Sequence, residues 1–389
     1  MLTGDFYGFQ DEVLTDRERE AVLALRAYLE ASVRPIADDC WVRARFPLEV
    51  VRPLAELGCY GAAWPETRRF EGSAVHRGWT AMELARVDAS VATFVGVTSG
   101  LAMGSIALTG SPEQRERWLP RMGRGELVGA FALTEPASGS DVARGLSTTA
   151  RREGGTWVLD GAKRWIGNAT FADVLVVWAR DVADGCVKGF LVTAGTPGLT
   201  TTRIEDKTAL RSVQNADVVL RGVRVPEERR LAGARSFKDT AAVLRLTRAE
   251  VAWQAVGVAM GAYEAALAHV GAREQFGRPL ASRQLVQDLL VRSLGDVTAS
   301  LALCVQASRL LDAGRQRDAH SALAKAYTTT RMRETVARCR ELLGGDGILP
   351  ARGVARHFAD AEAIYSYEGT REVNTLIVGR AITGHDAFA

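Results

Sequence analysis

Apolar positions recur at helical spacing in the first and last thirds of the chain. Thr15–Glu18 pairs a threonine with a glutamate three residues later, which is a capping box and predicts a helix start. The apolar positions that follow it are Val22, Leu23, Leu25 and Tyr28. Ser111–Gln114 repeats the capping signal, with proline at the first helical position. A long helix with one apolar face is predicted by Val286, Leu290, Leu294, Val297, Leu301 and Val305.

The middle of the chain has a different pattern, in which short β-rich runs alternate with glycine and charge. These runs are Trp157–Leu159, Val174–Trp178, Phe190–Val192 and Val218–Leu220. Their spacing predicts an antiparallel sheet or barrel. We therefore expect a mainly α-helical protein with a central β domain. The N-terminal helical domain is expected over residues 1–128, the β domain over 129–235 and a C-terminal helical bundle over 236–389.

Composition narrows the class of protein. The 389 residues are 47% hydrophobic and 24% charged, as in globular proteins with two or three packed units. No stretch approaches the roughly 20 apolar residues of a membrane helix, and the start of the chain does not resemble a secretory leader, so we expect a cytoplasmic protein with no membrane partner. The net charge of +3 is spread evenly, which disfavours nucleic-acid binding. The histidines are isolated and no CxxC pair occurs, so we predict no metal site.

One carboxylate stands in an unusual setting near the end of the chain. Glu368 lies between Tyr367 and Gly369, in an apolar and aromatic run that begins at Ile364. Partial desolvation there would raise the pKa of the carboxyl group above its usual value of about 4.3 and make it a better base at neutral pH. The functional interpretation is a general base that removes a proton from carbon. The structural alternative is a glutamate at a helix end, beside a chain-reversing glycine.

Five motifs follow one another in the order known from one enzyme family: Phe131–Asp141, Leu159–Asn168, Arg273–Leu280 with Gln284, Leu343–Ile348 and Tyr367–Thr370. Together they resemble the flavin-dependent acyl-CoA dehydrogenase family over most of the chain from Leu84 to Phe388. Tyr367 before the glutamate and the tail Leu376–Gly384 are most similar to the glutaryl-CoA dehydrogenase branch. Taken alone, a tryptophan such as Trp165 would read as core, and Gly344–Gly347 as a helix end.

The resemblance implies a homotetramer, a dimer of dimers, with FAD held at a subunit interface. It implies an acyl thioester substrate, carried by coenzyme A or by an acyl carrier protein, and an electron-transferring flavoprotein or oxygen as electron acceptor. The implied FAD contacts are Phe131, Leu133, Thr134, Ser140, Trp165, Ile166, Gly167, Arg273, Phe276, Gln284, Glu341, Leu342, Gly344, Gly345, Thr370 and Glu372. The implied substrate contacts are Ala92, Thr93, Ser140, Arg248, Tyr367 and Gly369.

The resemblance also implies a mechanism. Glu368 would remove a proton from the carbon next to the thioester carbonyl while the neighbouring carbon delivers hydride to the flavin, with the backbone N–H of Glu368 helping to hold the thioester oxygen. Some relatives place the base on an earlier helix, immediately before an arginine. Here that position is Thr247, which precedes Arg248 and cannot act as a carboxylate base. Glu250 follows two residues later and is either a substrate contact or a solvated helix glutamate.

The chain departs from the glutaryl branch at two positions. Glutaryl-specific relatives hold the distal carboxylate of the substrate with an arginine that is braced by a glutamate. Counting from Arg86–Asp88, these positions are Ala92 and Ala85. A buried carboxylate without an ionic partner is strongly disfavoured, so we expect neither glutaryl-CoA as substrate nor decarboxylation.

Several alternatives remain open at this level. The nearby Phe94, Val95, Val97 and Leu101 form either an apolar pocket for the acyl tail or ordinary core. The leading expectation is 2,3-dehydrogenation of a short or branched acyl-CoA. The alternatives are the same reaction on an acyl group tethered to a carrier protein, an oxidase that uses oxygen, and a flavin-binding protein without turnover. The presence of Glu368 argues against the last of these.

Overall fold

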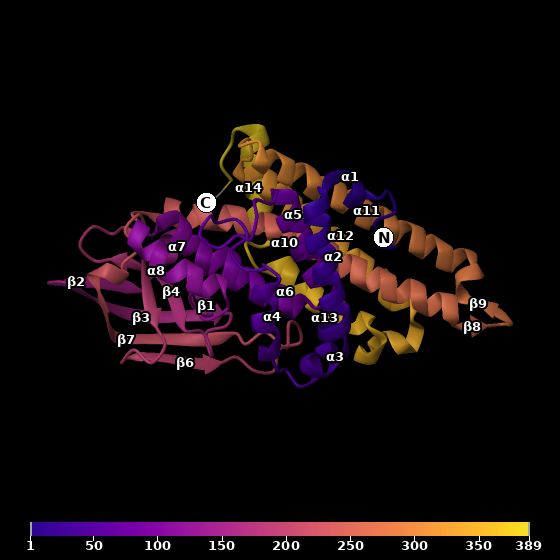
Figure 1. Ribbon diagram of the computed structural model, residues 1–389, viewed down its shortest axis with the longest axis horizontal. Helices are drawn as coiled ribbons and strands as arrows, with labels where there is room; N and C mark the ends of the chain where they lie inside the picture. The colour runs from indigo at the N-terminus through magenta and orange to yellow at the C-terminus, as the bar shows by residue number, and fades with distance from the viewer. Residues whose placement is uncertain (1, 388–389) are drawn as a thin grey trace.

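The N-terminal region of the computed structural model, which describes residues 2–387, is helical (Figure 1). Both predicted capping boxes are confirmed, at the starts of α2 and α8. Of the apolar positions predicted for the first helix, Val22 and Leu25 are buried whereas Leu23 is exposed. The α-helices are α1 (Phe9–Val13), α2 (Asp16–Tyr28), α3 (Arg34–Val42), α4 (Val51–Glu56), α5 (Ala74–Val87), α6 (Ala89–Val95), α7 (Gly104–Thr109) and α8 (Pro112–Gly123). The π-helical segments η1 (Leu29–Val33) and η3 (Gly96–Met103) and the 3₁₀ turn η2 (Leu48–Val50) lie between them.

The predicted β domain is a seven-stranded sheet, drawn in magenta at the left of Figure 1, with order β1-β4-β2-β3-β7-β6 and β5 on β4. The strands are β1 (Gly129–Ala132), β2 (Thr149–Glu153), β3 (Thr156–Ile166), β4 (Val174–Asp181), β5 (Val187–Thr193), β6 (Leu199–Arg203) and β7 (Ala216–Pro226), with the short α9 (Val142–Gly145) after β1 and η4 (Glu227–Arg229) after β7. All four predicted β runs are strands. The expectation of a purely antiparallel sheet is wrong, because β1 and β2 both pair parallel with β4. Alternation along one strand reports its buried face and not the direction of its neighbours.

The C-terminal region is a helical bundle built on three long helices. These are α10 (Phe237–Ala272), α11 (Gln284–Asp312) and α12 (Asp318–Leu342), followed by α13 (Val354–Ser366) and α14 (Arg371–Thr383). The hairpin of β8 (Glu274–Gln275) and β9 (Arg278–Pro279) and the turn η5 (Leu280–Ser282) connect α10 to α11, and η6 (Gly344–Ile348) and η7 (Pro350–Arg352) follow α12. The predicted apolar face of α11 is confirmed, since Leu290, Val297, Leu301 and Val305 are buried.

The N-terminal and C-terminal regions meet where α5 crosses α10. A Cβ added at Gly257 or Gly261 of α10 would lie 2.2 Å from the carbonyl oxygens of Met82 and Arg86 respectively. Only glycine permits this approach of two helix backbones. The crossing is also fixed by buried charge, because the guanidinium of Arg86 donates to Glu30, Glu83 and Glu264. This rigid crossing forms one wall of the site described below.

Two helical segments are longer and more apolar than the sequence analysis expected. Ala89–Thr109 and Phe237–Ala272 both have the length and composition of a membrane-spanning helix. The most apolar window of each is mostly buried within the fold, 67% in the first segment and 61% in the second. Their apolar character therefore serves core packing between α5, α6, η3 and α10.

Candidate active site

Glu368 lies on the loop between α13 and α14, in a backbone conformation that side chains rarely adopt. Its φ is +54°, and that of Gly369 is +85°. Such left-handed conformations in a non-glycine residue cost free energy, and they persist where the surrounding structure holds them. The helix-end interpretation and the functional interpretation of this segment are therefore compatible, because the turn is what directs the Glu368 side chain.

A buried lysine holds this loop from α12. The Nζ of Lys325 donates to the carbonyl oxygens of Tyr365 at 2.9 Å and Gly369 at 2.6 Å, on both sides of Glu368. From α14, the amide of Asn374 donates to the carbonyls of Gly369 and Thr370 at 2.9 and 3.0 Å. Burial lowers the pKa of Lys325 to about 8, and the nearby carboxylate of Glu368 partly offsets that effect. Two helices, α12 and α14, thus hold the loop that carries Glu368.

The Glu368 carboxylate accepts one hydrogen bond from α10. Thr247 Oγ1 donates to Glu368 Oε2 at 2.9 Å. Burial raises the pKa of Glu368 above its usual value, while the Thr247 hydrogen bond and the charges of Arg248 and Lys325 limit the rise. The predicted desolvation of Glu368 is borne out. In the sequence, Thr247 stood out only as a residue that cannot act as a base, and its role as a hydrogen-bond donor to Glu368 was missed.

Most of the predicted substrate contacts lie around this carboxylate. Tyr367 Oη donates to Gln254 Oε1 at 2.8 Å, and Gln254 Nε2 donates to the carbonyl oxygen of Ala92 at 3.4 Å. The Thr93 hydroxyl interacts with Tyr367, whose pKa is raised by burial. Arg248 Nε would lie 3.8 Å from a Cβ at Gly369 and is buried without a hydrogen-bond partner in the described part of the chain.

Ser140 is placed differently from the other predicted substrate contacts. It is exposed, on the loop that follows β1 in the sheet region. The structure therefore brings Ala92, Thr93, Arg248, Tyr367 and Gly369 together at Glu368. The predicted role of Ser140 stays a prediction.

A cleft of about 920 Å³, its open mouth included, lies next to these residues between α5, the α6–η3 segment and α10. Ala92, Val95, Gly96 and Gly100 line one wall, and Trp253 and Gln254 line another. Phe94 does not face the cleft. It packs against Phe46 and Tyr60, with ring centroids 4.6 and 6.2 Å away, and belongs to the core.

The cleft contains one carboxylate that the sequence analysis left open. Glu250 lines it and is half-buried, so its carboxyl group lies at the wall of the cleft. Burial raises the pKa of Glu250 to about 7, and the negative charge of Glu368 adds to the rise while Arg77 opposes it. The glutamate follows Thr247 by one helical turn of α10, which places both side chains on the same helix face.

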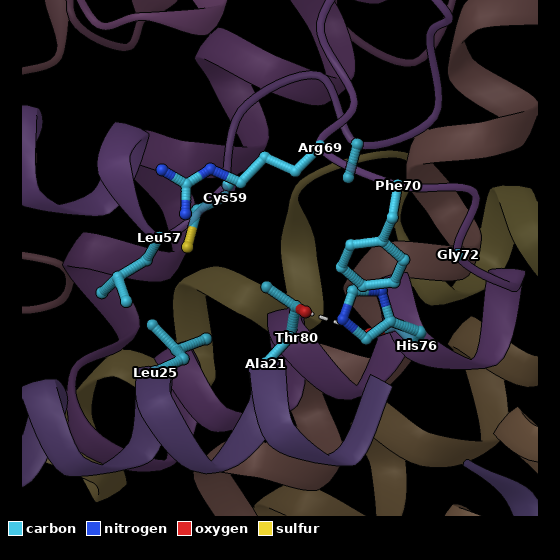
Figure 2. A pocket seen from close by; sticks show the side chains of 11 residues that line it. Ala21, Leu25, Leu57, Cys59, Arg69, Phe70, Gly72, His76 and Thr80 are labelled. Atoms are coloured by element: carbon cyan, nitrogen blue, oxygen red, sulfur yellow. Dashed lines mark hydrogen bonds between the residues drawn. The ribbon is translucent and has the colours of Figure 1, made fainter. Parts of the chain in front are cut away.

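A second, smaller cavity lies behind the cleft and shares Cys59, Ala62 and Thr80 with it. Figure 2 shows Arg69 extended over Cys59 and Leu57, and Phe70 beside His76 on the opposite side. Thr80 Oγ1 donates to the carbonyl oxygen of His76 at 3.0 Å. None of the predicted cofactor or substrate contacts lines this cavity.

In the sheet region, the predicted flavin contacts Thr134 and Trp165 lie on neighbouring backbone segments and define one surface. Arg164 N–H donates to the carbonyl oxygen of Thr134 at 2.9 Å, which joins the segment after β1 to the end of β3. Trp165 has a φ of +64° and its side chain is 52% exposed beside Thr134. An aromatic side chain held out of the core by a strained backbone fits a site for a planar ring. A Cβ at Gly167 would lie 3.3 Å from Val97 on η3, so this surface adjoins the cleft.

The predicted contacts on this surface differ in exposure. Phe131, Leu133 and Ile166 are buried, whereas Thr134 is half-buried and Trp165 is exposed. A buried ion pair contacts the backbone of this part of the sheet. Lys163 Nζ donates to Glu135 Oε1 at 2.9 Å and to the carbonyls of Leu133 and Trp178 at 3.1 and 2.7 Å. Strand ends are thereby fixed where the exposed tryptophan emerges.

The remaining predicted flavin contacts lie in the helical bundle. The β8–β9 hairpin projects at the end of the molecule opposite the sheet (Figure 1). Phe276 on it is 94% exposed with a φ of +52°, and Arg273 and Gln284 are exposed as well. Within one chain, the hairpin is therefore not brought to Trp165.

The other bundle contacts lie at two helix ends. At the end of α12, Glu341, Gly344 and Gly345 are exposed and Leu342 is buried. Thr370 caps α14, since its Oγ1 accepts from the N–H of Val373, and Glu372 is exposed in the first turn. No cluster of three or more potential metal ligands occurs among residues 2–387.

Comparisons with known proteins agree with this arrangement. Three family models match in order along the chain: the acyl-CoA dehydrogenase N-terminal domain over residues 15–126, the middle domain over 130–223 and the C-terminal domain over 237–383. The mitochondrial short-chain specific acyl-CoA dehydrogenase of Bos taurus is 32% identical over 91% of this chain and 87% of its own length.

Two solved structures extend the comparison to three dimensions. A glutaryl-CoA dehydrogenase from Mycobacterium smegmatis, in complex with FADH2, has a TM-score of 0.94 and 34% identity over 97% of both chains. Butyryl-CoA dehydrogenase from Megasphaera elsdenii has a TM-score of 0.90 and 30% identity, covering 95% of this chain and 98% of its own.

Proposed function

The chain belongs to the acyl-CoA dehydrogenase family, and from that premise we propose that it removes hydrogen from C2 and C3 of a short or branched acyl thioester, with FAD as cofactor. The observation that carries the proposal is the partly desolvated carboxylate of Glu368, held at the cleft by Lys325 and Thr247. A solvated glutamate would be too weak a base for a C–H proton. Here burial raises its pKa while hydrogen bonds keep it oriented.

The backbone of the same residue supplies a second group. The N–H of Glu368 makes no hydrogen bond to any residue that the structure describes. An unpaired donor beside the base suits the thioester oxygen, on which negative charge develops as the C2 proton leaves. Proton removal and charge stabilisation then depend on one residue, which explains why the loop is held from two helices.

Trp165 and Thr134 would hold the flavin ring, with Phe131, Leu133 and Ile166 buried in the same region. Flavin supplies the acceptor for the hydrogen that leaves C3. Because Gly167 adjoins η3, the ring would lie at the mouth of the acyl cleft. Closing the cleft around the thioester excludes water and keeps Glu368 desolvated.

The predicted flavin contacts on the hairpin of the helical bundle would contact FAD only when several chains assemble. The β8–β9 hairpin, which carries Phe276 and directly follows Arg273, lies at the end of the molecule opposite the sheet that carries Trp165, so these residues would reach a flavin bound to another copy (Figure 1). Leu285 on α11 is also 82% exposed, which extends the apolar surface next to the hairpin. Such exposed apolar side chains are typical of subunit interfaces. We infer a homotetramer in which each FAD is shared by two chains.

Anaerobic mixing of the flavin-loaded protein with a panel of thioesters tests the proposal. Bleaching of the flavin by a short-chain or branched acyl-CoA, with formation of the 2,3-enoyl thioester, is the expected result. If only the matching carrier-bound acyl group bleaches the flavin, the substrate is an acyl carrier protein thioester. Failure of every thioester to bleach a stoichiometrically bound flavin would contradict the proposal.

The electron acceptor is measured in the same preparation. Reduced enzyme is mixed either with an electron-transferring flavoprotein or with air-saturated buffer. Reoxidation by the flavoprotein alone identifies a dehydrogenase. Hydrogen peroxide formed at the rate of substrate turnover identifies an oxidase.

A further inference from the structure

The acyl cleft has a polar end that the reaction at Glu368 does not use. Among the described residues that line it, Arg77 and Glu250 are the only charged side chains. A Cβ at Gly100 would lie 2.7 Å from Glu250 Oε2 and 3.0 Å from Thr247 Cγ2. Both side chains thus converge on one bare stretch of η3, which is a π-helical segment of the kind often found at functional sites.

The carboxyl group of Glu250 has no hydrogen-bond donor among the described residues. No hydrogen bond and no ion pair within 4 Å joins its carboxyl group to any residue from 2 to 387. Arg77 influences it only through its charge, and Arg77 Nη1 donates instead to the carbonyl oxygen of Gly72 at 2.8 Å. Glu250 is half-buried at the cleft wall, so filling the cleft would remove its carboxyl group from water, which carries a substantial free-energy cost unless the bound group supplies a partner. A cleft for plain alkyl chains would have no use for such a group.

The position of Glu250 determines where a hydrogen-bond donor on the substrate would have to lie. Glu250 follows Thr247 by three residues on α10, which is about 4.5 Å along the helix axis, or about three carbon–carbon bonds. Thr247 itself contacts the carboxylate of the base. If the acyl chain runs from the C2 carbon at Glu368 along α10 into the cleft, the Glu250 carboxyl group would lie near C4 or C5.

We propose that the cleft binds acyl thioesters that carry a hydrogen-bond donor, a hydroxyl or an amino group, on C4 or C5, and that Glu250 accepts this hydrogen bond. The inference rests on the proposed function and specifies its substrate class. Arg77 balances the charge of Glu250, and its own charge is further compensated by Asp312 and Glu18. A distal carboxylate would face Glu250 as a like charge and is disfavoured there.

Stopped-flow bleaching of the flavin with four probes tests this substrate class. The probes are butyryl-CoA, 4-hydroxybutyryl-CoA, 4-aminobutyryl-CoA and glutaryl-CoA. We expect the native enzyme to favour a donor-bearing probe over butyryl-CoA by about 10- to 100-fold in kcat/KM, because a site built for a polar group binds poorly the analogue that lacks it. Glu250→Leu is expected to reverse this order, and Glu250→Asp to retain part of the preference.

Matched variants separate specificity from folding. Glu116→Gln alters an exposed glutamate on α8 outside the cleft and is expected to leave all ratios unchanged. If Glu250→Leu loses its flavin, Glu250→Gln supplies the comparison, since it keeps the shape of the side chain. If butyryl-CoA is the best probe for the native enzyme, or if glutaryl-CoA surpasses all others, the inference about Glu250 is overturned while the proposed function stands. A flavin that no thioester bleaches would instead overturn the proposed function.

Discussion

At the residue scale, the site depends on a glutamate whose backbone and side chain are constrained independently. The left-handed φ of Glu368 is held by Lys325 and Asn374, whereas its carboxylate is oriented by Thr247. Burial raises the pKa of the base, and the hydrogen bond from Thr247 lowers it. The acid limb of the pH profile of kcat/KM therefore depends on the balance between burial and this hydrogen bond.

Thr247→Val tests this balance without a change of side-chain shape. Loss of the hydroxyl removes an interaction that favours the ionised form, so the pKa of Glu368 rises. We expect the acid limb of kcat/KM to move to higher pH by about one pH unit, which corresponds to about 1.4 kcal/mol. Activity should approach the native value once the base is ionised at alkaline pH.

Thr240→Val provides the control on the same helix. The hydroxyl of Thr240 is buried without a hydrogen-bond partner among the described residues. The acid limb should stay at its native position in this variant. A Thr247→Val enzyme with a native pH profile would show that the hydrogen bond is absent in the working enzyme.

At the element scale, Lys325 links α12 to the loop between α13 and α14. We expect Lys325→Met to lower kcat by about 10- to 100-fold, because misplacement of a catalytic group by about 1 Å has effects of this size. The acid limb should also move to higher pH, since a positive charge near Glu368 is lost. Flavin bleaching across a pH series measures both effects.

Lys207 provides a control that distinguishes a general loss of stability from a misplaced Glu368. It donates to the carbonyls of Leu210 and Val213 in the sheet region, and burial lowers its pKa to about 8, as for Lys325. Lys207→Met should reduce the thermal midpoint without moving the acid limb. If Lys325→Met merely reduced the thermal midpoint in the same way, the proposed positioning of Glu368 would be wrong.

The strands beneath the flavin surface depend on the buried pair of Glu135 and Lys163. Burial alone would raise the pKa of Glu135, but Lys163 and the donors Ser147 and Thr148 hold it at about 2. As the pH falls, the carboxyl group of Glu135 takes up its proton in the unfolded chain before it does so in the folded protein. The contribution of Glu135 to stability is therefore present above pH about 4.5 and is lost as the pH falls towards 2. Glu135→Gln should lower the free energy of unfolding at pH 7 by about 3 kcal/mol.

Denaturant titrations at pH 7 and at pH 3 measure this contribution. The difference between native protein and Glu135→Gln should shrink at pH 3. Glu153→Gln removes an exposed partner of Arg151 and Arg224 and should change stability little at either pH, because solvent screens surface ion pairs. An equal loss of stability at both pH values would contradict the assigned charge state of Glu135.

At the scale of the whole molecule, the predicted flavin contacts on the sheet and those on the β8–β9 hairpin lie at opposite ends of one chain (Figure 1). Phe276→Asp places a charge on the exposed hairpin, where it would be buried on assembly. We expect this variant to form a smaller species than the native protein and to lose most of its FAD. Light scattering coupled to gel filtration, with absorbance at the flavin band, measures both quantities. A dissociated variant that retains its full flavin content would contradict the shared site.

Much of this organisation could be predicted from the sequence, because local signals report local structure. The capping boxes at Thr15 and Ser111 and the apolar stripe of α11 correspond to helices, and the apolar run around Glu368 predicted the desolvation of its carboxyl group. The parallel pairing of β1 with β4 could not be predicted, because it joins residues about 45 positions apart. Lys325 and Glu250 resemble solvated helix residues in the sequence. Only the packing of α12 and α10 against the loop and the cleft gives them their surroundings.

The most direct test of the account compares native enzyme with Glu368→Gln, which keeps the shape of the side chain and removes the base. Both are mixed anaerobically with the best thioester substrate, and the flavin band is followed. The account predicts that the variant binds FAD normally and bleaches about 10³-fold more slowly than the native enzyme. Bleaching of the variant at the native rate would contradict the assignment of Glu368 as the base.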